Sequence, residues 1–217
     1  MAKLSNTATR ILAAGVMLAG LVLVAVGQHW GWPTVRWLTL AIGMAMMVEM
    51  VVALRRAPRD NVRRNAWLYG AFLVWLVVVT VTGALVAARP WIILLMLMII
   101  VAADTGAWLF GKIIGGDKMW ERLSAGKTWS GQIAGILCGT FASVMYGLLG
   151  TDTFMPQLMW IGISVALLSQ YGDLTASLIK RRLGIKDFSN VIPGHGGILD
   201  RFDGWIYVLP VVWFVLI

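Results

Sequence analysis

Apolar residues form long runs along this chain, separated by short polar connections. A helix needs about 20 apolar residues to cross the hydrocarbon core of a bilayer. The pattern predicts about seven transmembrane helices, at residues 9–27, 34–54, 66–87, 91–111, 131–150, 157–179 and 202–217. The last run is short and contains Pro210, so its beginning is expected inside the preceding polar loop. We therefore expect an all-α, polytopic membrane helical bundle that forms a single domain over residues 1–217.

Composition agrees with an integral membrane protein. Of the 217 residues, 59% are hydrophobic and 13% are charged, whereas soluble domains carry roughly 25% charged residues. No small-residue cleavage pattern follows the first apolar run, so we interpret that run as a retained helix. The only cysteine, Cys138, lies in an apolar run, which excludes an intrachain disulfide and indicates a packing role.

Basic residues are concentrated in alternate connections. All but two of the 18 lysines and arginines lie at the N-terminal end or in the 55–64, 112–130 and 180–201 loops. The two exceptions are Arg36 and Arg89. Because lysine and arginine are retained on the cytoplasmic side of membranes, we expect a cytoplasmic N-terminus and a multi-pass protein of the cell membrane. The net charge of +8 then reflects topology and attraction to anionic lipids, and it does not indicate a nucleic-acid partner.

Three acidic residues interrupt the apolar runs: Glu49, Asp104 and Asp173. Acids within membrane spans are costly and usually functional. Glu49 lies six residues before Arg55, so we expect a structural ion pair there. Asp173, Ser177 and Lys180 have the i, i+4, i+7 spacing of one helix face. A buried carboxylate needs a cation, and a divalent metal supplies more charge than Lys180 alone.

The 112–130 loop contains Ser124-Ala-Gly-Lys127-Thr128 immediately before an apolar run. Backbone N–H groups, hydroxyls and an ammonium at the start of a helix suit phosphate oxygens. The segment is not a P-loop, because Glu121 stands where that motif requires its first glycine. A helix cap combined with a topological lysine remains an alternative interpretation.

The 180–201 loop and its flanks hold the densest polar chemistry. Gly194, Gly196 and Gly197 permit close backbone approach to an anion. Asp200 and Asp203 are three residues apart, so on one helical turn they could bind a hard cation through oxygens. The basic residues available to phosphate are Lys180, Arg181, Arg182 and Lys186. His195 is either a phosphate donor or a loop hydrogen-bonder, and with two histidines and one cysteine a zinc site is not expected.

The stretch S-L-I-K-R-R-L-G-I-K-D-F-S-N-V-I-P-G-H-G-G-I-L-D-R-F-D, residues 177–203, resembles the defining motif of the phosphatidate cytidylyltransferases, also called CDP-diacylglycerol synthases. The similarity extends to G-D-L-T before it and to A-D-T-G-A-W-L-F-G-K with the Ser-x-Gly-Lys-Thr-Trp loop, so it covers about residues 101–217. The chain departs from the family pattern at Ala125, Ser130 and Gly204 and is shorter than typical members. The resemblance implies N-terminal helices over 1–90 and a catalytic part over 91–217.

The resemblance implies the reaction of CTP with phosphatidic acid, giving CDP-diacylglycerol and pyrophosphate with Mg²⁺ as cofactor. The attacking phosphate is already largely dianionic because its second pKa is about 6. No strong general base is therefore required, and catalysis is expected to consist of positioning and charge neutralisation. We expect the site to face the cytoplasm, and a homodimer is compatible with the family.

The resemblance also assigns roles to residues. Asp173 and Asp200 are the expected metal ligands, supported catalytically by Asp104, Asp203 and Lys180. The expected substrate-binding residues are Ser124, Lys127, Thr128, Ser177, Arg181, Lys186, Asp187, Gly194, His195, Gly196, Gly197 and Arg201.

Three other functions are compared with this reaction on the same residues. A cytidylyltransferase acting on another phospholipid acceptor fits the same residues. An inactive lipid-binding or transport relative fits the shortened chain. A CDP-alcohol phosphotransferase does not fit, because Asp203-Gly204 is not followed by the Ala-Arg of that family's motif.

Overall fold

The computed structural model describes residue 27 and residues 33–120, 123–151, 155–192 and 196–216. The helix predicted at 9–27, together with Gly194 and His195, falls outside this part of the chain apart from residue 27 itself. The described residues divide into two compact units. The first comprises Met1–Ala88, Ile179–Phe202 and Trp213–Ile217, and the second comprises Arg89–Leu178 and Asp203–Val212. Each unit is described below by itself, and a single membrane domain remains a prediction.

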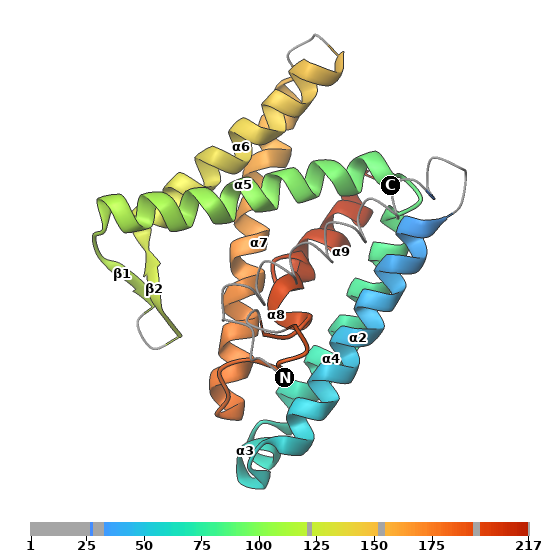
Figure 1. The fold of residues 1–217 in the computed structure, drawn as a ribbon, viewed down its shortest axis with the longest axis vertical. Coiled ribbons are helices and arrows are strands. Elements are labelled where there is room, and N and C mark those ends of the chain that lie inside the picture. Colours follow the sequence, from blue (N-terminus) through green and yellow to red (C-terminus); the bar gives the residue numbers. More distant parts are fainter. Residues whose placement is uncertain (1–26, 28–32, 121–122, 152–154, 193–195, 217) are drawn as a thin grey trace, which may run out of the picture. The chain divides into compact units, whose positions relative to one another are not determined.

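The first unit is built on two long helices that lie side by side (Figure 1). Its helices are α2 (Thr34–Arg56), α3 (Arg59–Arg64), α4 (Ala66–Val86) and the short α8 (Leu199–Phe202). A glycine permits the close approach of α2 and α4, because a Cβ at Gly43 would lie 2.2 Å from the Thr80 hydroxyl oxygen. The 179–202 segment therefore packs with the N-terminal helices, although the sequence grouped it with residues 91–217.

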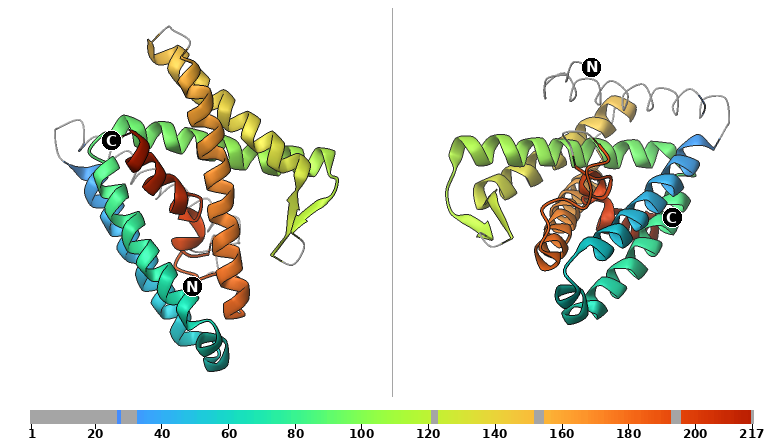
Figure 2. Two further views of the ribbon diagram at one scale, coloured as in Figure 1. Left: turned by 180° about the vertical axis from the view of Figure 1, so that it is seen from behind. Right: turned by 60° about the horizontal axis from the view of Figure 1, so that its bottom comes forward.

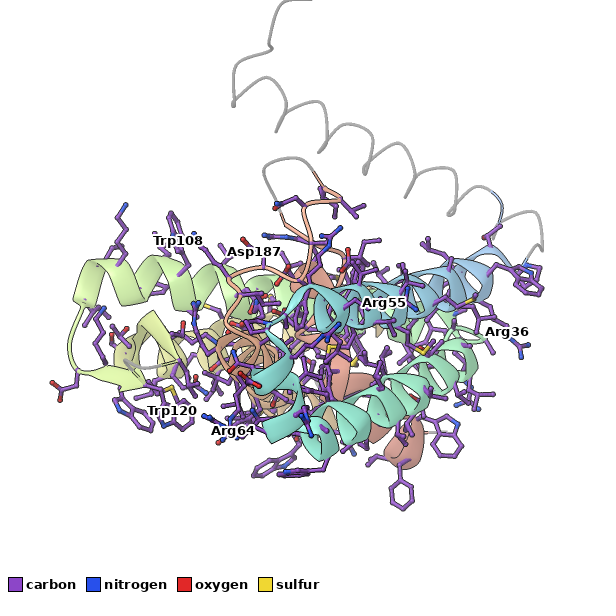
Figure 3. The ribbon with its side chains drawn as sticks, turned by 90° about the horizontal axis from the view of Figure 1, so that it is seen from below. Arg36, Arg55, Arg64, Trp108, Trp120 and Asp187 are labelled. Carbon is purple, nitrogen blue, oxygen red and sulfur yellow. The ribbon has the colours of Figure 1, made fainter. Side chains whose placement is uncertain are left out.

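Arginines gather at one end of this helix pair. Arg36 lies at the opposite end of α2 from Arg55, and Arg64 follows on α3 (Figure 3). Membrane helices typically carry most of their lysines and arginines at one end, and the arginines of α2 and α3 follow that pattern. A cytoplasmic N-terminus stays a prediction.

The second unit contains a helix pair and a hairpin. Its elements are α5 (Pro90–Ile114), β1 (Lys118–Trp120), β2 (Ser124–Thr128), α6 (Trp129–Thr151), and parts of α7 (Pro156–Leu183) and α9 (Trp205–Leu216). Figure 2 shows α5 and α6 close together where the hairpin joins them. Small residues allow this contact, because a Cβ at Gly131 would lie 2.6 Å from the Ala107 carbonyl oxygen. Cys138 packs against Gly106, which confirms its expected role in packing.

The hairpin corrects the expectation of an entirely helical chain. Helix α5 ends at Gly115, where φ is 66°, and Gly116 follows with φ of 99°. Both values lie in the left-handed region that glycine adopts without strain. Strands β1 and β2 then pair antiparallel, with Lys118 opposite Thr128. The predicted phosphate loop is thus mostly a strand that leads directly into α6.

Four helices in the described part of the chain are long and apolar enough to cross a membrane: α2, α4, α5 and α6. They confirm four of the predicted spans as helices, and they make this a membrane protein. Helix α7 has 28 residues but also carries polar residues along its length, and α9 has 12 residues. Both were predicted as helices, whereas the total of seven spans stays a prediction.

Candidate active site

Helix α7 stops at a glycine that starts the signature loop, residues 184–198. Gly184 has φ of 77°, its N–H donates to the Arg181 carbonyl at 3.2 Å, and Ile185 N–H donates to the Lys180 carbonyl at 3.0 Å. This pair of bonds is the Schellman arrangement, which ends a helix by using its last carbonyl groups. The loop therefore leaves the helix in a defined direction, one turn beyond Lys180.

The Asp200 carboxylate organises this loop within the first unit. Lys180 Nζ lies 2.7 Å from Asp200 Oδ1, and the side chains are 11% and 5% exposed. Backbone N–H groups of Phe188 and Gly197 donate to Oδ2 at 2.9 and 3.0 Å. Both oxygens of Asp200 thus have protein donors, which attach the loop at Phe188 and Gly197.

Glu49 of α2 is the second carboxylate beneath the loop. The residue is 5% exposed and accepts hydrogen bonds from Ser189 Oγ at 2.6 Å, Ile198 N–H at 2.9 Å and Leu199 N–H at 2.8 Å. A Cβ at Gly197 would lie 2.6 Å from Glu49 Oε2, so a larger residue there would displace the Glu49 carboxylate. The predicted ion pair with Arg55 is wrong for the described residues, because Glu49 stabilises backbone N–H groups of the signature loop and α8 instead.

One prediction tests this attachment at its side-chain donor, Ser189. Replacing Ser189 by alanine removes one neutral donor to Glu49, so we expect a loss of about 1–2 kcal/mol in loop stability. Tryptic cleavage after exposed Lys186 in detergent should accelerate several-fold. The neighbouring exposed Asn190→Ala variant is the matched control and should be cleaved at the wild-type rate. Equal cleavage of all three proteins would contradict the attachment.

A polar cavity of about 310 Å³ lies inside the second unit. Its charged lining residues come from three elements: Asp104 from α5, Lys127 from β2 and Asp173 from α7. Lys127 Nζ lies 2.5 Å from Asp173 Oδ2, with side chains 25% and 40% exposed. Three of the predicted site residues therefore lie around one cavity, and their roles stay predictions.

The three hydroxyl residues at or near the cavity differ in what they contact. Gly131 N–H donates to Thr128 Oγ1 at 3.1 Å, so the alternative interpretation of Thr128 as a helix cap is confirmed. Ser124 lines the cavity. Ser177 Oγ lies 3.4 Å from Asp173 Oδ1, which is a weak hydrogen bond that agrees with the predicted shared face.

The remaining predicted residues are distributed over both units. Arg181, Lys186, Asp187 and Arg201 are exposed, and Figure 3 shows Asp187 on the loop. Asp203 Oδ1 accepts the Gly204 N–H at 2.9 Å, and a Cβ at Gly172 would lie 2.2 Å from the Asp203 carbonyl oxygen.

The expected metal ligands belong to different units, Asp173 to the second and Asp200 to the first. A metal shared by them stays a prediction. Among the described residues, no three His, Cys, Asp or Glu side chains gather as a metal cluster.

Two glutamines that line the cavity were not predicted from the sequence as site residues. Gln132 is 8% exposed and Gln170 is 5% exposed, and both line the cavity. Neither Nε2 nor Oε1 of Gln170 has a hydrogen-bond partner. Gln170 precedes Asp173 by one helical turn, and that spacing within an apolar run was the available signal.

The sequence of this chain is similar to those of known proteins. A model described as the cytidylyltransferase family matches residues 1–217. The phosphatidate cytidylyltransferase of Staphylococcus aureus (strain COL) is 33% identical over 210 residues, which cover 93% of this chain and 78% of that protein. The phosphatidate cytidylyltransferase of Staphylococcus epidermidis (strain ATCC 12228 / FDA PCI 1200) is 40% identical over 126 residues, covering 58% of this chain and 48% of that protein. The family match includes the N-terminal helices, which the sequence motifs left out.

Proposed function

Because this chain belongs to the cytidylyltransferase family and is therefore a nucleotidyltransferase, we propose that it transfers the cytidylyl group of CTP to phosphatidic acid. The products are CDP-diacylglycerol and pyrophosphate. The observation that carries the proposal is the cavity in which Lys127, Asp104 and Asp173 meet. A polyanionic substrate requires a cation, and carboxylates on the same cavity suit a divalent metal that binds phosphate oxygens.

The donor set of the cavity fits Mg²⁺. This ion prefers oxygen ligands and is usually held by one or two carboxylates, with waters and substrate phosphates completing its coordination. Asp104 and Asp173 offer two such carboxylates, one from α5 and one from α7. When bound, Mg²⁺ would neutralise charge on the triphosphate. Asp200 is assigned a positioning role, since its oxygens accept three protein donors.

The protein's own residues supply binding and charge. A phosphate oxygen of the lipid attacks the α-phosphorus of CTP, and the bond to the pyrophosphate oxygen breaks. Lys127 is the cation positioned to bind a phosphate oxygen, and on substrate binding it exchanges its contact with Asp173 for that oxygen. Arg181 and Lys186 belong to the other unit, and their phosphate-binding roles stay predictions. No side chain is required as a strong base, because the lipid phosphate is already ionised.

The apolar helices and the arginine distribution support a multi-pass protein of the cell membrane with this site on the cytoplasmic side. CTP would then reach the site from the cytoplasm, whereas phosphatidic acid would enter from the bilayer.

The test is turnover by the purified full-length protein in detergent or liposomes. We expect CDP-diacylglycerol and one equivalent of pyrophosphate to form from CTP and phosphatidic acid in the presence of Mg²⁺, and formation to stop when Mg²⁺ is chelated. A panel of other phosphorylated lipids, including prenyl phosphates, identifies the acceptor. Absence of any CDP-lipid with the whole panel would refute the transferase assignment, and product with another acceptor alone would refute phosphatidic acid.

A further inference from the structure

The Gln170 side chain is the most conspicuous polar group that the proposed reaction leaves without a role. It lies in α7, is 5% exposed, and neither its amide nitrogen nor its amide oxygen has a partner. A buried amide without partners costs roughly 1–3 kcal/mol. Because Gln170 lines the polar cavity that also contains Lys127 and Asp173, a bound ligand is the natural source of the missing hydrogen bonds.

The chemistry of the amide limits the type of ligand. An amide presents a donor and an acceptor side by side. Phosphate oxygens, ester carbonyls and metal ions would each satisfy only one of these two groups. A nucleobase edge satisfies both, and cytosine presents its amino donor next to the N3 acceptor. We propose that Gln170 binds the cytosine base of CTP and contributes to the selection of this nucleotide, an inference that rests on the proposed function.

The surroundings of Gln170 agree with a base subsite. Gln170 lies one helical turn, about 4.5 Å along the axis, from Asp173, so the amide and the carboxylate are neighbours on one face of α7. Trp108 also lines the cavity, and the Lys112 ammonium lies 5.5 Å from the centroid of its ring. The cavity volume of about 310 Å³ lies at the lower end of small-molecule sites.

Helix α6 lies against the amide of Gln170. A Cβ at Gly135 would lie 2.6 Å from Gln170 Nε2, so the missing side chain at Gly135 makes room for the amide. Cytosine presents its amino donor and its N3 acceptor to the amide, whereas uracil presents an acceptor and a donor at the same positions. The amide orientation that pairs with cytosine therefore opposes uracil.

The test compares Gln170→Met with wild type in the full-length enzyme. Methionine has a similar length and lacks both hydrogen-bonding groups. We expect kcat/KM for CTP to fall by about 10- to 100-fold, the preference for CTP over UTP to collapse, and the KM for phosphatidic acid to stay unchanged. Binding of CTP measured calorimetrically without lipid should weaken equally. Gln157→Met, an exposed glutamine on the same helix, is the matched control and should behave as wild type.

Thermal stability without nucleotide separates this role from a structural one. Removal of an unpaired amide should leave the unfolding temperature unchanged or raise it. A lower unfolding temperature with unaltered CTP preference would overturn the inference, and so would a change confined to dCTP relative to CTP or to the KM for phosphatidic acid. These outcomes require an active wild-type enzyme, so they differ from failure of the proposed function, in which wild type makes no CDP-lipid.

Discussion

Asp173→Asn is expected to reduce CDP-lipid formation by at least about 100-fold, the loss typical of removing one charge-stabilising group from a preorganised site. Asp173 borders the cavity from α7 and contacts Lys127 at 2.5 Å. Asparagine keeps the shape of the side chain but removes the charge that holds Lys127 and that would bind Mg²⁺. The measurement is initial rate at saturating CTP and Mg²⁺, with the Mg²⁺ concentration for half-maximal rate as a second readout.

The control for this substitution is Asp117→Asn, the same change at an exposed residue of the same unit. It should retain wild-type activity. The double variant Asp173→Asn with Lys127→Met distinguishes a structural ion pair from a catalytic one. If the pair were only structural, the double variant would regain activity along with stability, and that result would contradict the assignment.

The sequence predicted helices well because their signal is local. Apolar runs of sufficient length specified α2, α4, α5 and α6 to within a few residues at their ends. The β1–β2 hairpin was not predicted, since its strands are three and five residues long and contain glycine and charged residues. Gly115 and Gly116 end α5 just before β1, and neither strand shows a hydrophobic alternation that would predict it.

The sequence indicated which polar residues are unusual, but it did not indicate which residues they contact. Charge in an apolar run identified Glu49, Asp104 and Asp173 correctly as unusual residues. Sequence neighbours suggested an arginine for Glu49, whereas its partners are 140 to 150 residues away. Long-range contacts of this kind are decided by packing, so no spacing rule indicates them. Gln170 was overlooked because its only sequence signal was its spacing of one helical turn from Asp173, and an uncharged amide attracts less notice than an acid.

Glu49→Ala is expected to release the signature loop and to abolish most of the activity, although Glu49 lies on α2, outside the signature motif. Alanine leaves Ser189 Oγ and the N–H groups of Ile198 and Leu199 without their acceptor. Each buried unpaired donor costs roughly 1–3 kcal/mol, so the total destabilisation should be about 3 kcal/mol or more. Tryptic cleavage after Lys186 should therefore accelerate far more than in Ser189→Ala.

Two comparisons make the Glu49 prediction specific. Glu49→Gln keeps one acceptor oxygen and places an amide nitrogen against the remaining donors, so its cleavage rate and activity should lie between those of wild type and Glu49→Ala. Val48→Ala alters the adjacent residue of α2, which is 60% exposed, and should match wild type. Since the three bonds join α2 to the loop and α8, damage should begin at the loop, and cleavage after Lys186 should precede loss of the α2–α4 pair on heating. Unchanged cleavage and activity in Glu49→Ala would show that Asp200 and Lys180 hold the loop without help from α2.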